Sequence, residues 1–537
     1  MPTFVLGALI LHLVLVQPNH PAAMTWDALR VLPLELPVIL LGLVALRPGP
    51  MAMAVRVALV FALTSIALLK AADYAMFTAL GRGFNPVADI SLVEAGLRLL
   101  TGATGPVMAA AAALGAVAAV AVTAWLLWWA TGPWARLTPP PVPRLVTAVA
   151  AIVAAGIAVA EIGQAMGRWN IPVTPPGSAF TARVGVERVE MVRETLADLR
   201  AFRAAAAEDS YAEADRLLDE VDRDVLVVFV ESYGRASLDT PLYAATHRAT
   251  LKAAEDRLGE LGLSMRSGLV AAPTRGGQSW LSHATFANGL WIADQTSYGA
   301  ALASGRETLF HIAARSGFRT AAVMPQITLD WPEANFMGFE TVLAARDLGY
   351  GGLPFNWVTM PDQFTFAALD RLLRPGTGDR PLFAQVALGS SHAPWVPVPD
   401  LVDWDSIGDG SVFDEMALSG DPPDVVWRDR DRVRDQYRLA VDYALRVVFD
   451  YAARHAEDPP LMIVIGDHQA AGFVALDERP DVPVHIIGPD SLVEKTRAWG
   501  WQRGLRPDTD SEVRPMDRLR DMILDTFSSV SPERIES

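Results

Sequence analysis

The sequence contains no cysteine, which excludes disulfide bonds, cysteine-ligated metal sites and a cysteine nucleophile. It also has no block of basic residues, and its net charge is −16, so the electrostatic footprint of a nucleic-acid-binding protein is missing. Charge of either sign is scarce in the first third of the chain, whereas the remainder carries most of the Asp, Glu, Lys and Arg. This contrast predicts a membrane region followed by a water-soluble domain within the 537 residues.

Hydrophobic residues make up 51% of the chain and concentrate in five apolar stretches near the amino terminus. Each stretch covers most or all of the roughly 20 residues that a bilayer-spanning helix needs, although the first is short. The first stretch has neither a basic segment before it nor an obvious cleavage site, so we interpret it as a span and not as a removed signal peptide. We expect a transmembrane domain of about five helices in residues 1–165, formed by stretches 2–18, 29–46, 56–80, 106–130 and 145–165.

Arginines indicate which ends of these spans face the cytoplasm. Arg47 and Arg56 lie between the second and third spans, and Arg136 and Arg144 lie between the fourth and fifth, while the other connections show a weaker positive bias. The positive-inside rule therefore places the N-terminus in the cytoplasm, and five crossings deliver everything after about residue 166 to the outer side. We expect a multi-pass protein of the cytoplasmic (inner) membrane whose soluble domain is periplasmic or extracellular.

Two charged residues interrupt the third stretch near its outer end. Lys70 and Asp73 are one helical turn apart in the sequence. Charged residues within a span are costly, so they are usually paired with one another or used for function. A snorkelling or neutralised ion pair and a contact with lipid head groups both fit this pattern.

The chain changes character after the spans. Residues 166–222 begin with WNIPVTPPGSAF and continue into charged helical sequence, which indicates a juxtamembrane linker and helical arm. In residues 223–537, short continuous apolar runs alternate with helical segments, which is typical of a mostly parallel sheet covered by helices on both faces. The expected strands are 224–230, 319–324, 382–388, 461–465 and 482–487, the expected helices are 247–262, 306–316, 363–373 and 430–455, and the acidic tract around 400–426 is expected to be a surface loop.

Potential metal ligands follow three of the expected strands. Glu231 comes directly after the first strand in VFVESYG, His392 follows a later one in SSHAPW, and Asp467 and His468 follow LMIVIG. The carboxyl ends of strands in a doubly wound sheet converge on one crevice, so we expect these side chains to lie together. Their mixture of oxygen and nitrogen donors favours Mn or Zn over Ca. Taken singly, each residue also fits a solvated strand end or a satisfied core histidine.

The segment APTRGGQSWLSHATFANGLW (272–291) offers a fourth ligand and a nucleophile. Gly276 and Gly277 permit a sharp turn, and Ser279 then stands where a helix is expected to begin, so the helix-start amides favour negative charge there. A divalent cation would lower the pKa of the Ser279 hydroxyl enough to make it nucleophilic. An ordinary N-cap serine fits the same position, and Thr274 and Ser282 are rival nucleophiles.

The motifs VESYG, GGQS, SSHAPW and GDHQ together resemble the alkaline phosphatase/sulfatase superfamily, and in particular its membrane branch of lipoteichoic acid synthases and phosphoethanolamine transferases. The resemblance implies an alkaline phosphatase-like catalytic domain in residues 223–537. It also implies that Glu231, Ser279, Asp467 and His468 bind one divalent metal, Mn or Zn, with Ser279 in the place usually held by threonine.

Substrate-binding residues are implied by the same resemblance. His392 matches the family histidine near the substrate phosphate, and Trp331 in QITLDWPEANFMGFE (326–340) matches an aromatic position of the substrate pocket. The synthases carry an Arg shortly after this tryptophan, where this chain reads WPEAN, which argues against a glycerol-phosphate polymerase. A second metal is compatible with His283 or His485, which equally fit packing or supporting roles.

The implied activity is that of a membrane-anchored, metal-dependent transferase. It would move a phosphate-linked head group, of the phosphoglycerol or phosphoethanolamine type, from a phospholipid to a lipid or glycan acceptor. Sulfate-ester hydrolysis through formylglycine does not fit. The sulfatases that the chain resembles make formylglycine from the Cys or Ser of a C/S-x-P-x-R motif, whereas Ser279 is followed by WLSH, which has neither the Pro nor the Arg. An outer-facing phosphodiesterase, phosphatase or other sulfatase-like hydrolase is one alternative, and a non-catalytic binding or sensor protein that keeps the fold is another.

Overall fold

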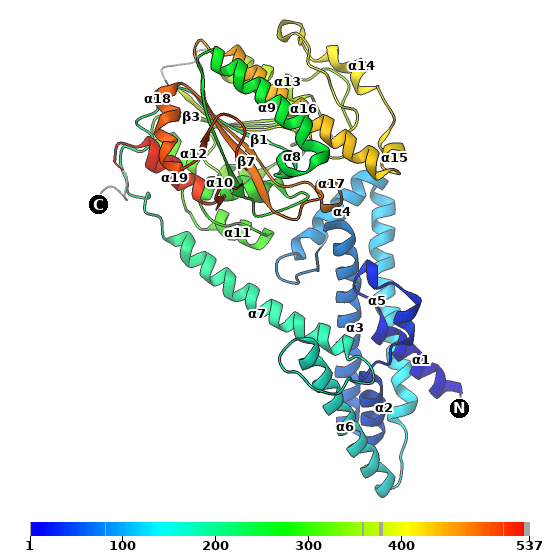
Figure 1. Cartoon of the computed structure of the whole chain (residues 1–537). Coiled ribbons are helices and arrows are strands. Elements are labelled where there is room, and N and C mark those ends of the chain that lie inside the picture. Colours follow the sequence, from blue (N-terminus) through cyan, green and yellow to red (C-terminus); the bar gives the residue numbers. More distant parts are fainter. Residues whose placement is uncertain (1, 81, 357–358, 375–379, 509, 531–537) are drawn as a thin grey trace. The chain divides into compact units, whose positions relative to one another are not determined.

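The computed structural model describes residues 2–80, 82–356, 359–374, 380–508 and 510–530 of the chain. The chain divides into two compact units, Met1–Asp198 and Leu199–Ser537. The division falls inside helix α7 (Phe180–Ala207), so a single continuous helix contributes to both units (Figure 1).

The first unit is built from apolar helices. Pro106 and Pro141 begin α5 and α6, where proline is favoured because the first amide of a helix has no partner within it. In chain order its elements before α7 are α1 (Pro2–Val16), η1 (Pro21–Ala23), η2 (Trp26–Arg30), α2 (Glu35–Ala45), α3 (Pro50–Leu80), α4 (Ile90–Thr104), α5 (Pro106–Ala135) and α6 (Pro141–Ala165).

Helix length separates these elements into two groups. Within the described residues, three helices are long and apolar enough to cross a membrane, namely α3, α5 and α6. The apolar helices α1 and α2 have 15 and 11 residues. They are therefore about 22 and 16 Å long at 1.5 Å per residue, which is shorter than a hydrocarbon core of about 30 Å. The structure thus supports three candidate spans, and the count of five stays a prediction.

Lys70 and Asp73 are buried, but the contacts of each lead elsewhere and not to the other. The Lys70 ammonium donates hydrogen bonds to the Leu15 carbonyl at 3.1 Å and to the Thr181 hydroxyl at 2.6 Å. Asp73 forms an ion pair with Arg188 and accepts hydrogen bonds from the side chain of Asn19 and the amide of Phe84. Both side chains therefore have partners within the first unit. The expected ion pair of one with the other is not formed, and the contact with lipid head groups stays a prediction.

The second unit contains a nine-stranded sheet in the order β4-β3-β5-β1-β6-β7-β2-β8, with β9 paired to β2. Neighbouring strands from β4 to β6 run parallel, as predicted from their continuous apolar sequence. The strands are β1 (Val225–Val230), β2 (Ser264–Ala271), β3 (Arg319–Met324), β4 (Thr341–Ala344), β5 (Leu382–Ala387), β6 (Leu461–Gly466), β7 (Asp481–Gly488), β8 (Gln502–Arg503) and β9 (Val513–Pro515).

Strand β7 departs from the predicted pattern. It runs antiparallel to both β6 and β2, so its amino end and not its carboxyl end lies at the edge where β1 and β6 finish. His485 lies inside this strand, paired with Ser267 of β2. An antiparallel strand that is buried on both faces has the same continuous apolar sequence as a buried parallel strand, so the sequence does not reveal its direction.

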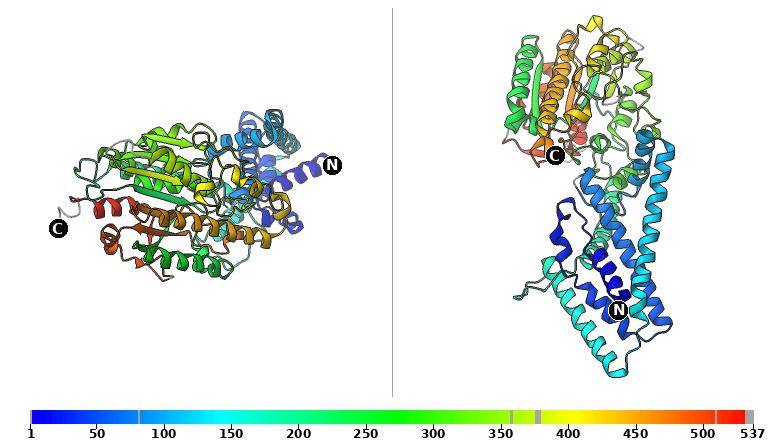
Figure 2. Two further views of the ribbon diagram at one scale, coloured as in Figure 1. Left: turned by 90° about the horizontal axis from the view of Figure 1, so that it is seen from above. Right: turned by 90° about the vertical axis from the view of Figure 1, so that its right-hand side faces the viewer.

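Helices cover both faces of the sheet. Helices α9, α13 and α16 pack on the face that carries Leu226 and Val228, with α9 and α16 side by side. Helices α10, α12 and α19 pack on the face of Val227 and Phe229 (Figures 1 and 2).

The acidic tract 400–426 contains only short helical turns. The remaining elements of this unit are α8 (Ala236–Asp239), α9 (Pro241–Glu260), α10 (Ser279–Asn288), α11 (Gln295–Ala303), α12 (Leu309–Arg315), η3 (Pro332–Phe336), η4 (Ala345–Asp347), α13 (Asp362–Leu373), η5 (Trp404–Ser406), η6 (Ser411–Phe413), α14 (Asp414–Ala417), α15 (Pro423–Val426), α16 (Arg430–Arg454), α17 (Gly472–Ala475), α18 (Asp490–Val493), η7 (Glu494–Trp499) and α19 (Arg518–Phe527).

Candidate metal centre

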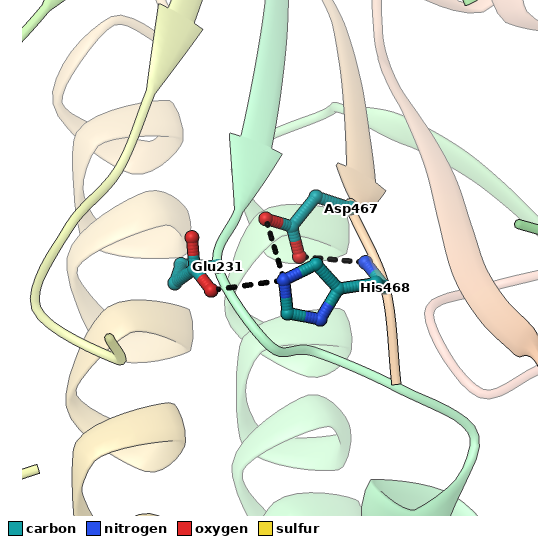
Figure 3. Close-up of side chains that lie close together, drawn as sticks. All are labelled: Glu231, Asp467 and His468. Atoms are coloured by element: carbon teal, nitrogen blue, oxygen red, sulfur yellow. Dashed lines mark hydrogen bonds and ion pairs between the residues drawn. The ribbon is translucent and has the colours of Figure 1, made fainter. Parts of the chain in front are cut away.

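Two neighbouring strand ends bring three potential metal ligands together. The register pairs Val230 of β1 with Gly466 of β6, so the residues that follow these strands begin side by side. Glu231, Asp467 and His468 each offer one ligand atom, and these atoms all lie within 4.8 Å of one another (Figure 3). All three side chains are buried. The convergence predicted for Glu231, Asp467 and His468 is therefore present in the fold, whereas His392 is not part of this cluster.

Gly466 is required by the close approach of the two strand ends. A Cβ atom at this position would lie 1.9 Å from the main-chain oxygen of Tyr233, a separation that no side chain tolerates. The glycine of the GDHQ motif thus allows the segment after β1 to pack against the end of β6, which places Asp467 and His468 beside Glu231.

The imidazole of His468 is held in one orientation by the main chain. Its Nδ1 lies 3.0 Å from the Gln469 carbonyl oxygen, which can only accept, so Nδ1 is the donor. Its Nε2 lies 3.2 Å from Glu231 Oε1 and 3.7 Å from Asp467 Oδ2. The remaining ring nitrogen therefore faces two carboxylates, and the cluster needs a positive charge between or upon these groups.

The charges of the cluster shift the pKa of each member. Burial raises the pKa of Asp467, and the neighbouring Glu231 carboxylate raises it further. Burial opposes protonation of His468, but the two carboxylates outweigh it and raise the pKa of the imidazole to about 9. Burial also acts against ionisation of Glu231, yet the charge of His468 holds its pKa below the usual range. A proton on His468 or a bound cation would supply the charge that the carboxylates require.

The donor set fits a divalent transition metal. Two carboxylates and an imidazole nitrogen suit Zn or Mn better than the all-oxygen cages preferred by Ca. Main-chain and hydroxyl donors orient the carboxylates, because Ser232 donates its amide to Asp467 at 2.8 Å and its hydroxyl to Glu231 at 2.9 Å. Outer hydrogen bonds of this kind are a regular feature of metal sites.

Ser279 lies beside this cluster at the first residue of α10. Its hydroxyl donates a hydrogen bond to Glu231 Oε2 at 3.1 Å and lies 3.3 Å from His468 Nε2. The approach to the helix uses the glycines as expected, since Gly276 and Gly277 have φ values of +70° and +140°, in the region that favours glycine. The hydroxyl is therefore positioned to act as a fourth ligand.

Ser279 and the rival nucleophiles Thr274 and Ser282 have different surroundings. The N-cap position belongs to Gln278, so Ser279 is not the capping residue of α10. The Thr274 hydroxyl donates to the Gly277 carbonyl at 2.8 Å within the preceding turn. Ser282 is fully buried, and its hydroxyl oxygen has no hydrogen-bond partner in the described part of the chain. Among these hydroxyls, only that of Ser279 has a recorded contact with the ligand cluster.

His392 follows β5 on a segment that is tied to the cluster. The side chain is exposed, and its Nδ1 donates to the Ala393 carbonyl at 2.5 Å, which leaves Nε2 for another partner. The neighbouring Ser391 donates its hydroxyl to the main-chain oxygen of Glu231 at 2.6 Å. Asp362, the first residue of α13, accepts the amides of Gly389 and Ser390 at 2.8 and 2.9 Å and so fixes the same segment.

Sequence reasoning missed Ser232, Ser391 and Asp362. The two serines stand next to predicted site residues in ESYG and SSHAPW, a signal that was available. Asp362 offers no such signal, because it follows Met360–Pro361 far from any site motif and reaches the segment only through the fold.

Trp331 packs among aromatic side chains after β3. It packs against Phe339 with ring centroids 6.3 Å apart and contacts Tyr298. It follows β3, which is separated from β1 by β5 in the sheet. Its predicted contribution to a substrate pocket therefore stays a prediction.

His485 and His283, the two candidates for a second metal, both pack among other side chains of the domain. His485 Nδ1 lies 2.7 Å from the Ser267 hydroxyl, and its Nε2 lies 3.1 Å from the Tyr233 hydroxyl, so both ring nitrogens are occupied. His283 packs against Phe229 with ring centroids 4.1 Å apart and the rings tilted by 38°, and burial lowers its pKa to about 4. Its Nε2 is buried and has no hydrogen-bond partner in the described part of the chain.

Comparison with known families identifies the domain that carries this site. Residues 223–481 match the model of the family described as Sulfatase. These residues form a sulfatase-family domain. The match confirms the predicted resemblance to the alkaline phosphatase/sulfatase superfamily, and the sulfatase domain contains Glu231, Ser279, Asp467 and His468. No curated protein matches the sequence.

Several solved structures are similar to the chain. A lipoteichoic acid synthase from Listeria monocytogenes has 11% identity and a TM-score of 0.39, with 61% of this chain and 78% of that chain covered. A phosphoglycerol transferase from Streptococcus pyogenes, in complex with sn-glycerol-1-phosphate, has 14% identity and a TM-score of 0.38, with 63% and 83% covered. An integral membrane lipooligosaccharide phosphoethanolamine transferase from Neisseria meningitidis has 13% identity and a TM-score of 0.40, with 77% and 76% covered.

Proposed function

We propose that the protein is a membrane-anchored, metal-dependent transferase that moves a phosphate-linked head group from a phospholipid to a lipid or glycan acceptor. The observation that carries the proposal is the contact of the Ser279 hydroxyl with Glu231 and His468 at the start of α10. A hydroxyl at that point combines a nucleophile with metal ligands and with helix-start amides that favour a phosphoryl group. The candidate membrane spans of the same chain support a lipid donor.

In the proposed first step, Ser279 Oγ attacks the phosphorus of the donor. The new Oγ–P bond replaces the bond between phosphorus and the lipid oxygen, which leaves as the hydroxyl of diacylglycerol. The proton lost by Ser279 balances the proton gained by that oxygen, and the exposed His392 is suited to exchange it and to contact the phosphate. In the second step, an acceptor hydroxyl attacks the phosphoserine, the Oγ–P bond breaks and Ser279 regains its proton.

Glu231, Asp467, His468 and Ser279 would hold one divalent metal, Mn or Zn. When bound, the metal lowers the pKa of a hydroxyl ligand and neutralises charge that develops on the transferred phosphoryl group. Ser232 and Gln469 orient the ligands through the hydrogen bonds described above. We propose that the transferred head group is of the phosphoglycerol or phosphoethanolamine type and that the acceptor is a lipid or a glycan.

The membrane part of the proposal is a five-span arrangement. It places the N-terminus in the cytoplasm and the sulfatase domain on the periplasmic or extracellular side of the cytoplasmic membrane. The arginines at 47, 56, 136 and 144 support it, and the short helices α1 and α2 would need their flanking residues to complete a crossing. Together with residues 1–165 as membrane domain and 166–222 as juxtamembrane arm, this completes the proposed organisation.

Trapping the covalent intermediate tests the proposed function. Full-length protein is incubated with Mn or Zn and a phospholipid labelled in its head-group phosphate, and the reaction is quenched early. We expect label on the peptide that contains Ser279, and a labelled lipid or glycan product when membrane extract is added as acceptor. Label on Thr274 or Ser282 would reassign the nucleophile. Free labelled head group as the only product, with or without acceptor, would make the protein a hydrolase.

A further inference from the structure

Three apolar side chains form an exposed rim in the sulfatase domain. We define the aromatic rim as Trp427, the C-terminal capping residue of α15, together with Phe473 of α17 and Leu476 directly after that helix. Their exposed fractions are 41%, 37% and 52%. The rings of Trp427 and Phe473 meet edge to face with centroids 6.1 Å apart. Exposed apolar side chains that gather in this way indicate a binding surface more often than isolated ones do.

The aromatic rim is connected to the metal centre by a short series of contacts. Trp427 stacks on the buried Trp395, with centroids 5.7 Å apart and rings inclined by 5°. Trp395 donates its indole N–H to the Ser391 carbonyl at 2.7 Å, and Ser391 in turn donates its hydroxyl to the main chain of Glu231. Phe473 follows His468 by only five positions in the chain. Contacts through Trp395 and Ser391 therefore connect the aromatic rim to the strand end that carries Glu231.

Trp427 is held rigidly although much of its surface is exposed. Its indole N–H donates to the Pro394 carbonyl at 3.2 Å, and its ring is supported by Trp395 below and Phe473 beside it. An exposed tryptophan with a fixed orientation offers a large apolar area whose ordering costs little on binding.

Leu476 occupies a position that local structure does not favour for leucine. It is the C-terminal capping residue of α17 and has a φ of +56°, in the left-handed region where glycine or asparagine is preferred. About half of its side chain is exposed, so packing in the core does not explain the choice either. Neither the backbone conformation nor packing in the core explains a large apolar residue at this position, which indicates a role at the surface.

We propose that the aromatic rim binds the acyl chains of the phospholipid donor. This inference rests on the proposed function: the phosphate of a phospholipid is joined directly to the glycerol that carries its chains, so a surface that borders the phosphoryl site must accept apolar groups. The aromatic rim supplies an apolar surface that is connected to Glu231 through Trp395 and Ser391, while Ser279 and His392 would contact the phosphate. Binding of the chains removes both their apolar surface and that of the aromatic rim from water.

Photolabelling of the full-length protein in nanodiscs tests this inference. The probe is a phospholipid whose acyl chain carries a diazirine, and labelled peptides are identified by mass spectrometry. We expect label on the peptides that contain Trp427 and Phe473. Leu476→Asn suits the left-handed backbone and should keep or raise the melting temperature, yet together with Phe473→Ser it should lower that labelling about fivefold or more.

A kinetic comparison uses the same variants. The double variant should raise KM for a long-chain donor about tenfold, and several times more than for a short-chain donor of the same head group. Leu261→Asn is the matched control, because Leu261 is 46% exposed but follows the far end of α9. It should leave labelling and both KM values at the parent level.

The two levels of the proposal can fail separately. Unchanged labelling and KM in the double variant, with normal transfer by the parent protein, would overturn the role of the aromatic rim and leave the proposed function standing. Label on the Trp427 and Phe473 peptides of a parent protein that transfers no phospholipid head group would uphold the lipid contact and overturn the proposed function.

Discussion

The Ser279 hydroxyl donates a hydrogen bond to the Glu231 carboxylate at 3.1 Å, although 48 positions of sequence separate the two residues. Glu231 follows a central strand of the sheet, whereas Ser279 begins a helix on one of its faces. Their contact joins the strand-end cluster to a hydroxyl outside it, and it is the relationship on which the proposed chemistry depends.

Ser279→Ala should remove turnover while leaving folding and membrane insertion intact. The loss should be on the order of a thousandfold or more, because the covalent route is no longer available. Ser279→Thr should retain part of the activity, since it keeps a hydroxyl at the same position. Turnover of a labelled phospholipid measures both variants, and full activity in Ser279→Ala would refute the covalent mechanism.

Asp467→Asn should sharply lower metal occupancy, because it removes a charged ligand from a buried site. Metal analysis of the purified protein after equilibration with Zn or Mn measures this change. Asp458→Asn is the matched control, since the Asp458 side chain is 93% exposed and lies in the turn before β6. Equal metal content in the parent and the Asp467 variant would show that the cluster is not the metal site.

The metal-free protein should lose stability as the pH rises from about 6.5 to about 9. The pKa of His468 is raised from 6.5 to about 9 by the buried carboxylates, so folding binds its proton more tightly. The resulting stabilisation is complete below pH 6.5 and is lost as the pH passes the folded-state pKa. The raised pKa of Asp467 acts in the same direction. The lowered pKa of Glu231 contributes only at lower pH, near the ordinary range of carboxyl groups.

Thermal melts at several pH values check this expectation. In the presence of a chelator, the melting temperature should decline over this window, and saturating Zn or Mn should weaken or reverse the decline, because metal competes with protons for the same donors. A melting temperature that is independent of pH in the chelator would contradict the electrostatic account of the cluster.

A reporter fused to Ser537 should be active if it requires the outer side of the membrane. The arginine distribution predicts a cytoplasmic N-terminus, and the proposed five crossings would then place the sulfatase domain outside. The control is a reporter that works only in the cytoplasm, fused at the same point. Activity of the cytoplasmic reporter alone would rule out the five-span arrangement.

The parallel part of the sheet was predictable because buried parallel strands have continuous apolar sequences. DVLVVFV and LMIVI correspond to β1 and β6, and the helix expected near Ser279 begins at that residue. The direction of β7 was not predictable, since burial on both faces hides strand orientation. Strand β2 was missed because SMRSGLVA mixes polar and apolar residues in a fully covered position.

Some residues of the site could be predicted from local sequence, and others could not. Glu231, Asp467 and His468 could be found because each directly follows a recognisable strand. Asp362 and Ser391 act through hydrogen bonds to the main chain of distant segments, and no local pattern encodes such contacts. Composition also located the apolar helices but not their ends, which left α1 and α2 shorter than their apolar stretches.

The hydrogen bond from His468 to the carbonyl of Gln469 has a consequence for how the site tolerates sequence change. The acceptor is part of the backbone, so every amino acid at position 469 supplies it. A substitution at position 469 therefore keeps the acceptor of the imidazole, provided that the loop keeps its path. The Gln469 side chain accepts a hydrogen bond from the Ala236 amide at 3.3 Å and so helps to anchor the loop. Its replacement would therefore affect the imidazole only through the path of the loop.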